Sequence, residues 1–247
     1  MSDIQWCIEY LKRYDGIKKT PDIGDEALFR ALQNVTMPKD LDDEFYRKQD
    51  EVLSEISSKK QIVDVADFPL GITIHKGDIT LIKADAVVNA CNGKMLGCFV
   101  PGHHCIDNAI HSFAGLQVRR DMMEIMKAQG HDEKNGECKV TKAYNLPSKY
   151  IFHTVGPVYS GRKQDAIDLE NCYLSCLKKA DEMGLKSIVF CSLSTGVFGY
   201  PIRDASAIAV KTVKKYLQNE NRAIEKVVFD VFGDRDFEVY EKTLSNN

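Results

Sequence analysis

The spacing of hydrophobic residues changes near residue 65 of this 247-residue chain. Before that point the apolar positions recur every three to four residues, most clearly after Pro38, where they include Leu41, Phe45 and Val52. This spacing places the apolar side chains on one face of a helix, and proline suits a first helical turn. The pattern therefore predicts about three helices in residues 1–60.

Beyond the segment "VADFPLG", short apolar runs alternate with longer stretches of helical spacing. The short runs have the length and composition of buried strands: "ITIHKG", "DAVVNA", "YIFHTVG", "SIVFCSL" and "KVVFDVFG". The helical stretches cover about residues 106–129, 165–184, 202–218 and 234–244. Strands that alternate with helices indicate a three-layer α/β/α domain. We expect a helical extension over residues 1–65 that packs on an α/β/α core over residues 66–247.

The composition is that of an ordinary globular protein, with 44% hydrophobic residues, 28% charged residues and a net charge of −3. A slightly negative chain has no overall attraction to nucleic acid or to anionic lipid. The N-terminus lacks the features of a signal peptide, and no stretch approaches the ~20 apolar residues that span a bilayer. We expect a soluble cytoplasmic protein without a membrane or nucleic-acid partner, in which cysteines within apolar runs, such as Cys172 and Cys176, are buried thiols.

Ligands of α/β sheets gather at the carboxyl ends of the strands, so polar residues that follow the apolar runs are candidate site residues. Asp78 follows "ITIH", and its carboxylate can accept hydrogen bonds from the amino group of a ligand or from its own turn. Asn89 and Asn92 follow "DAVV". Their amides suit sugar hydroxyls, but they can equally tie a loop together.

A loop of small residues follows "SIVFC", in the segment "SLSTGVFGYP". Ser194 and Gly196 precede a helix predicted to start near Pro201, and the backbone amides of such a loop can hold a phosphate or pyrophosphate. A tight connection with glycine would have a similar sequence. Phosphate binding explains the segment better, because Phe198 and Tyr200 are costly to leave on a loop without a partner.

The segment "GCFVPGHHC" holds two thiols and two imidazoles in nine residues. Thiolates and imidazoles are the preferred ligands of zinc, and three protein ligands leave a fourth tetrahedral position open. Residues two apart in an extended segment point the same way, so His103 and Cys105 can converge on one ion, together with Cys98. The alternatives are unligated cysteines, histidines that bond only to the backbone, or a structural ion with His104 or Asp107 as a fourth ligand.

The ordered set "GDIT", "NACN", "AIHSFAG", "HTVGP", "STGVFGYP" and "VVFDVF" resembles the macrodomain family, whose members are ADP-ribose-binding α/β/α modules with a mixed central sheet. The resemblance covers about residues 69–244. It implies that Asp78 holds the adenine amino group and that Ile79 offers its backbone amide nearby. It also implies that Asn92 reaches the distal ribose and that Phe232 lies against the adenine, whereas Asn89 is a structural amide at a strand end. The residues implied to wrap the diphosphate are Ser194, Thr195, Gly196, Val197, Phe198, Gly199 and Tyr200.

Most macrodomains carry a run of glycines after the asparagine loop, where this chain has Cys98, His103 and Cys105. This pattern is similar to the zinc-containing branch of the family and implies one Zn²⁺ per chain. Two thiolates cancel the charge of the ion, which weakens it as a Lewis acid, so we expect a second catalytic group. Asp107 occupies the place of the catalytic aspartate of hydrolytic macrodomains, although a carboxylate at a helix start is also favoured simply as an anion. Asn108 could contact the same ribose.

These features together predict a zinc-dependent hydrolase that removes mono-ADP-ribose from protein side chains, with an ester link to aspartate or glutamate. Asp107, Asn92 and Asn108 are its predicted catalytic residues. One competing hypothesis is a reader module that binds ADP-ribose without cleaving it and holds a structural zinc. Another is an interaction protein whose helical N-terminus docks a partner. His153 lies within an apolar strand pattern and is predicted to be a buried core histidine.

Overall fold

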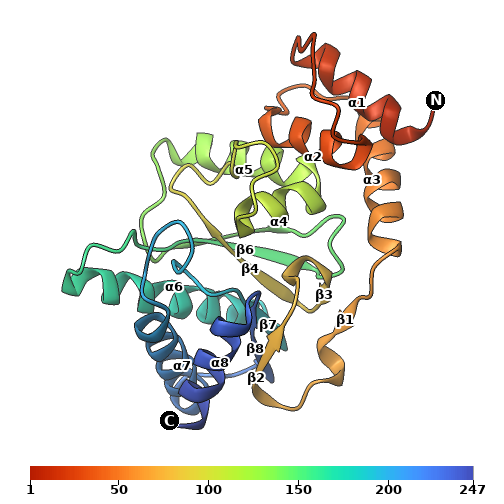
Figure 1. Ribbon diagram of the computed structural model, residues 1–247. Coiled ribbons are helices and arrows are strands. Elements are labelled where there is room, and N and C mark those ends of the chain that lie inside the picture. Colours follow the sequence, from red (N-terminus) through yellow and green to blue (C-terminus); the bar gives the residue numbers. More distant parts are fainter. Residues whose placement is uncertain (247) are drawn as a thin grey trace.

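The structure, a computed structural model, describes residues 1–246 and is built around a six-stranded sheet (Figure 1). The order of its strands is β2-β8-β7-β4-β6-β5. Only the edge strand β5 runs antiparallel to its neighbour in this sheet. The sheet is therefore mixed, as predicted, and the carboxyl ends of five strands meet at one edge. The bounds of the strands are Gly71–Lys76 for β2, Ala86–Cys91 for β4, Cys138–Lys142 for β5, Tyr150–Val155 for β6, Ser187–Phe190 for β7 and Lys226–Val231 for β8.

Helices cover both faces of the sheet, which confirms the predicted three layers. Helices α4 (Ile106–Ala114) and α5 (Leu116–Gln129) lie on one face. The other face is covered by α6 (Lys163–Glu182), α7 (Ile202–Asn219) and α8 (Asp234–Ser245). Because both faces are covered, the central strands are continuous apolar runs rather than alternating ones.

Three N-terminal helices precede the sheet, as predicted: α1 (Asp3–Tyr14), α2 (Asp25–Val35) and α3 (Asp43–Ser58). They share a small apolar core, and Leu116 of α5 is buried in the same cluster. Helix α2 packs beside α4, so the extension lies on the face of the sheet that carries α4 and α5 (Figure 1).

The helix expected directly after Pro38 begins only at Asp43, because Asp42 caps it. The Asp42 side chain accepts a hydrogen bond of 2.8 Å from the backbone N–H of Phe45, which satisfies one of the free donors of the first turn. Two short elements connect α3 to the main sheet, β1 (Val63–Asp64) and the 3₁₀ turn η1 (Val65–Asp67). Two more lie between β2 and β4, the 3₁₀ turn η2 (Ile79–Leu81) and β3 (Ile82–Lys83), which pairs with β1.

The helix predicted over residues 106–129 is two helices, α4 and α5. Gly115 interrupts it with φ 97° and ψ 167°, a conformation that only glycine adopts without strain. Strand β5 is absent from the predicted runs because its sequence, "CKVTK", is short and two of its five residues are lysine. An edge strand that is covered only in part does not need a continuous apolar run.

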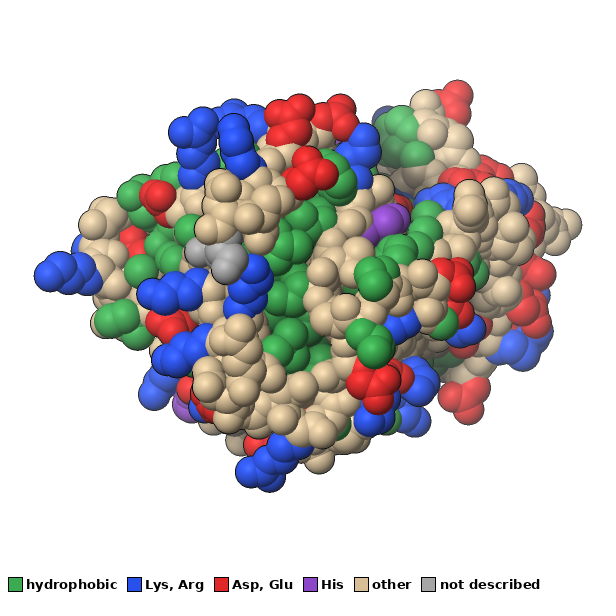
Figure 2. Space-filling view, turned by 90° about the horizontal axis from the view of Figure 1, so that it is seen from below, with side chains coloured by type: hydrophobic (Ala, Val, Ile, Leu, Met, Phe, Trp, Pro, Cys, Tyr) green, Lys and Arg blue, Asp and Glu red, His purple; other side chains and the backbone are tan. Residues whose placement is uncertain are grey.

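All eight cysteines are free thiols, and Cys172 and Cys176 are fully buried, as predicted. No helix within residues 1–246 has the length and apolar character needed to cross a membrane. On the face drawn in Figure 2, acidic and basic side chains alternate around a central area of hydrophobic side chains. That face therefore carries no single-sign field of the kind that attracts nucleic acid.

Candidate active site

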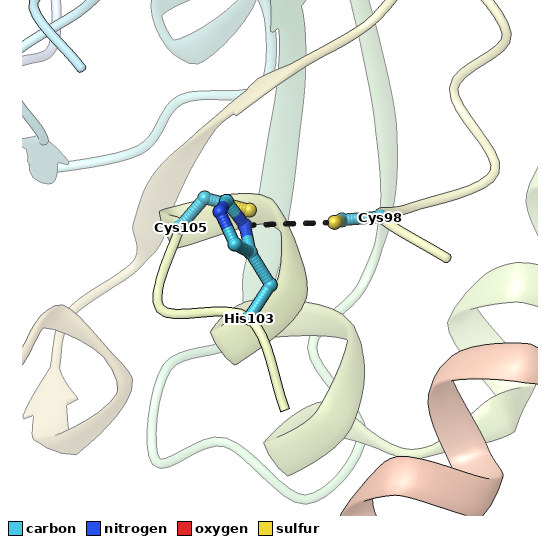
Figure 3. A group of neighbouring side chains, drawn as sticks. All are labelled: Cys98, His103 and Cys105. Atoms are coloured by element: carbon cyan, nitrogen blue, oxygen red, sulfur yellow. Dashed lines mark hydrogen bonds between the residues drawn. The ribbon is translucent and has the colours of Figure 1, made fainter. Parts of the chain in front are cut away.

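The loop that joins β4 to α4 brings two thiols and an imidazole together at the carboxyl edge of the sheet. The side chains of Cys98, His103 and Cys105 point toward one another (Figure 3), and their ligand atoms all lie within 4.8 Å of one another. The Cys98 Sγ atom is 3.7 Å from His103 Nδ1. A tetrahedral zinc ion with bonds of about 2.3 Å to sulfur and about 2.0 Å to nitrogen places such atoms roughly 3.5 Å apart. These three residues therefore fit a zinc ion.

Cys105 is also the N-cap of α4. Its Sγ atom accepts a hydrogen bond of 3.4 Å from the backbone N–H of Asn108. Burial raises the pKa of the Cys105 thiol to about 11, so the metal-free thiol is protonated at neutral pH. A bound cation would convert it to the thiolate and release a proton.

The cluster contains neither of the residues considered as a fourth ligand. Within residues 1–246, Cys98, His103 and Cys105 are the one group of three or more histidines, cysteines or acidic residues whose ligand atoms all lie within 4.8 Å of one another. His104 instead lines a hollow between the loop and α2. Three protein ligands leave one tetrahedral position for water or substrate, which is the arrangement of a catalytic zinc site.

Asp107 lies in the first turn of α4, two residues after the last cysteine of the cluster. Its Oδ1 atom accepts a hydrogen bond of 2.8 Å from Asn89 Nδ2, and its Oδ2 atom accepts a longer one of 3.5 Å from Asn92 Nδ2. Burial raises the pKa of the Asp107 carboxyl to about 6, against the opposing effects of the Asn89 hydrogen bond and the Arg119 charge. A carboxyl group with a pKa near the working pH is suited to general acid or base catalysis.

Asn89 has a more specific position than a structural amide at a strand end. Besides its bond to Asp107, its Nδ2 atom lies 3.2 Å from Nδ1 of the fully buried His153. The other ring nitrogen of His153 bonds to Thr141 Oγ1 at 3.0 Å, which confirms that His153 is a satisfied core histidine. Asn89 orients Asp107, a relation that the sequence could not show because the residues are 18 positions apart.

Asn108 follows Asp107 in the same helical turn, but its side chain is fully buried. Its Oδ1 atom accepts hydrogen bonds of 3.1 and 2.9 Å from Arg30, and its Nδ2 atom donates to the Val100 carbonyl at 3.0 Å. Both ends of the amide are thus engaged within the protein. We place Asn108 in the support of the loop rather than against the substrate.

Asp78 lies beyond β2, at the same sheet edge. Its Oδ1 atom accepts hydrogen bonds from the N–H and the hydroxyl of Thr80, at 3.0 and 2.6 Å. The turn considered from the sequence is therefore present, and Oδ2 is the oxygen that remains for a ligand. Ile79 is buried, whereas Phe232, which follows the neighbouring strand β8, is 85% exposed. An aromatic ring exposed to this extent is available for stacking.

The loop between β7 and α7 crosses closely over the segment "HTVGP". A Cβ atom at Gly156 would collide with Ser194 Oγ in its present position, so any larger residue there would require the Ser194 side chain to turn. The Ser194 Oγ atom is buried and has no hydrogen-bond partner within residues 1–246, an arrangement that a ligand could complete. Tyr200 is buried and packs on Tyr159 at a ring distance of 4.8 Å, whereas Val197 is 78% exposed.

Comparison with known proteins agrees with this fold. Residues 88–209 match the Macro domain family. The chain is 45% identical over 256 residues to a protein-ADP-ribose hydrolase of Treponema medium, with 97% of each chain covered. A protein-ADP-ribose hydrolase of Staphylococcus aureus is 45% identical over 229 residues, which cover 89% of this chain and 85% of the relative.

Solved structures of macrodomains have the same fold as this chain. A Trypanosoma brucei macrodomain in complex with ADP-ribose superposes with a TM-score of 0.67 at 29% identity and covers 91% of this chain and 96% of its own. An Oceanobacillus iheyensis macrodomain with ADPR gives a TM-score of 0.65 at 37% identity, over 70% of this chain and 91% of its own. The relatives match over most of the chain, and this chain belongs to the macro domain family.

Proposed function

We propose that this protein is a protein-ADP-ribose hydrolase that depends on zinc held by Cys98, His103 and Cys105. The observation that carries the proposal is the position of Asp107, a buried carboxyl two residues beyond the three-ligand cluster and held by the amides of Asn89 and Asn92. The relatives named protein-ADP-ribose hydrolase, which match over most of the chain, support it. A protein that only binds ADP-ribose has no evident need of this combination.

The rest of the site is assigned to ADP-ribose. The Asp78 Oδ2 atom and the Ile79 backbone amide would bind the adenine, and the exposed Phe232 ring would lie against it. Asn92 would contact the distal ribose. The loop of residues 194–200 and the N-terminus of α7 would surround the diphosphate with backbone amides.

The bond that is broken joins the distal ribose to an aspartate or glutamate side chain of the modified protein. Asp107 orients the attacking water and accepts its proton, while Asn89 and Asn92 hold the carboxylate in place. Bound zinc would supply a Lewis acid beside the distal ribose, weakened because the thiolates of Cys98 and Cys105 cancel its charge. The carboxylate of the modified protein leaves as a stable anion, so no covalent enzyme intermediate is required.

We place this reaction in the cytoplasm, where free thiols such as the eight of this chain stay reduced.

The direct test uses two substrates, a protein mono-ADP-ribosylated on aspartate or glutamate and one modified on serine. We expect ADP-ribose to be released from the acid-linked substrate and retained on the serine-linked one. Release from serine alone would contradict the ester assignment. Tight binding of free ADP-ribose with no release from either substrate would indicate a reader module.

A further inference from the structure

The metal-binding loop is attached to the N-terminal helical extension at several separate points. Between Cys91 and Ile106 the chain forms no helix or strand, and its internal backbone hydrogen bonds are those of turns, from Met95 to Asn92 at 2.9 Å and from His103 to Val100 at 3.2 Å. Helix α2 supplies further partners. The Gly102 backbone N–H donates to Asn34 Oδ1 at 2.9 Å, and Asn34 Nδ2 donates to Ser112 Oγ of α4 at 2.8 Å. Asn34 therefore joins the loop to the helix that follows it.

Arg30, one turn earlier in α2, reaches the ligand segment itself. Its Nη2 atom donates to the His103 carbonyl at 3.0 Å and to Asn108 Oδ1 at 2.9 Å, and its Nε atom donates to the same Oδ1 at 3.1 Å. One guanidinium thus fixes the backbone of a predicted zinc ligand and the first turn of the helix that carries Asp107. Its rigid fork of donors allows both contacts at once, which an ammonium group could not match.

Arg119 of α5 completes the attachment from the other side. It is 1% exposed, and it donates to the Leu96 carbonyl at the start of the loop at 2.7 Å. Its Nη1 atom also donates to the carbonyls at the end of α2, those of Gln33, Asn34 and Thr36, at 2.8, 3.0 and 2.6 Å. The end of α2 and the start of the loop are therefore fixed to the same buried guanidinium.

We propose that α2 of the extension is a part of the active site and that Arg30 is a positioning residue, which holds the His103 backbone and the start of α4 in the geometry that binds the metal. The proposal rests on the proposed function, since it assigns Arg30 a role toward that metal site. A hollow of about 800 Å³ runs along α2, lined by α2 itself, the segment before it and α3, and bordered on the loop side by Pro101, Gly102 and His104. Beside this hollow, the hydrogen bonds of Arg30 and Asn34 join α2 to the loop.

The test compares Arg30→Met, Arg30→Lys and the control Arg47→Met in the full chain. Arg47 belongs to α3 of the same extension, but within residues 1–246 its guanidinium pairs only with the exposed Glu51. The measurements are the rate of zinc transfer to a chromogenic chelator, the affinity for free ADP-ribose, and kcat and KM for the modified protein. Arg119 is not suitable as the test position, because removal of so buried a cation would unfold the region.

We expect Arg30→Met to release zinc about tenfold faster or more and to lower kcat by a similar factor, because charge-assisted hydrogen bonds are lost from the loop. KM and the affinity for ADP-ribose should stay within about threefold, since the hydrogen bonds of Arg30 go to His103 and Asn108 and it acts on Asp78 through its charge alone. Arg30→Lys should recover part of the loss, and Arg47→Met should match the parental protein.

The inference would be overturned if Arg30→Met released zinc at the same rate as the parental protein and had the same kcat. It would also be overturned if zinc retention, ADP-ribose affinity and melting temperature all fell together, because that pattern indicates a general structural role. A parental protein that binds no zinc would contradict the metal site of the proposed function itself, and the inference with it.

Discussion

Burial and neighbouring groups shift the pKa of the Asp107 carboxyl in opposite directions. Burial raises the pKa of its carboxyl to about 6, whereas the Asn89 hydrogen bond and the charge of Arg119 favour the anion. Asp107→Asn removes the charge at nearly constant volume. We expect it to lower single-turnover release of ADP-ribose by about 100-fold, the usual loss on removal of a general base, with zinc content unchanged by elemental analysis. Undiminished turnover with zinc bound would reduce Asp107 to a helix-start charge.

His153 predicts a pH dependence of stability. Burial lowers the pKa of its imidazole to about 3, from 6.5 in the unfolded chain, so below pH 6.5 the unfolded state binds a proton that the folded state does not. The contribution of His153 to the free energy of unfolding is therefore complete above pH 6.5. As the pH falls from 6.5 toward 3, proton uptake by the unfolded state lowers the free energy of unfolding by about 1.4 kcal/mol per pH unit.

His153→Gln removes this contribution. In metal-free protein, urea unfolding between pH 6.5 and 4.5 should show a stability that declines less steeply in the variant, by about 1 kcal/mol per pH unit. Titrating groups distant from His153 cancel in this comparison. His111 is coupled to the substituted position, because its pKa is lowered by burial and by the charges of Arg119 and His153. Parallel curves for the two proteins would contradict the assignment.

Single residues differ in how far the sequence predicts them. The short spacing of Cys98, His103 and Cys105 allows convergence to be predicted, because an extended segment brings residues two apart to one side. The amide pair around Asp107 and the engagement of Asn108 by Arg30 depend on residues from distant segments. No local spacing indicates those contacts.

Among the elements, α4 and α5 are separated by a single residue, Gly115, which ends one helix and precedes the other. Gly115 has φ 97° there, and a Cβ atom would collide with the side chains of Gln117 and Gln49. We expect Gly115→Ala to destabilise the protein by about 2 kcal/mol or more, measured by urea unfolding. Gly130→Ala is a control for positive φ alone, since Gly130 lies in the left-handed region with φ 77° and ψ 4° and a Cβ atom there meets nothing within 4 Å. Equal losses in the two variants would show that neither the crowding nor the ψ of 167° at Gly115 adds to the loss.

The same element shows what hydrophobic spacing misses. The apolar positions of α4 and α5 keep the same three-to-four residue spacing across residue 115. Periodicity therefore predicts one helix where the backbone forms two. The buried strands β4 and β7 are predicted well because burial on both faces demands an uninterrupted apolar run. The edge strand β5 has no such demand and is predicted poorly.

At the scale of the whole molecule, the extension and the sheet domain depend on each other. Leu116 of α5 is buried in the core of the extension, and α2 is bonded to the metal-binding loop. The likeness to the Treponema medium relative covers 97% of both chains, the extension included. The division at residues 65 and 66 remains a prediction, and we propose that the two parts fold and act as one unit.

The measurement that tests the central claim most directly is release of ADP-ribose from an aspartate- or glutamate-modified protein, before and after a chelator has removed the metal. We predict turnover by the protein as isolated, loss on chelation, and recovery when zinc is added back. Cys98→Ala should show neither turnover nor recovery, because one ligand of the cluster is gone. Undiminished turnover by protein shown by elemental analysis to be free of metal would contradict the account.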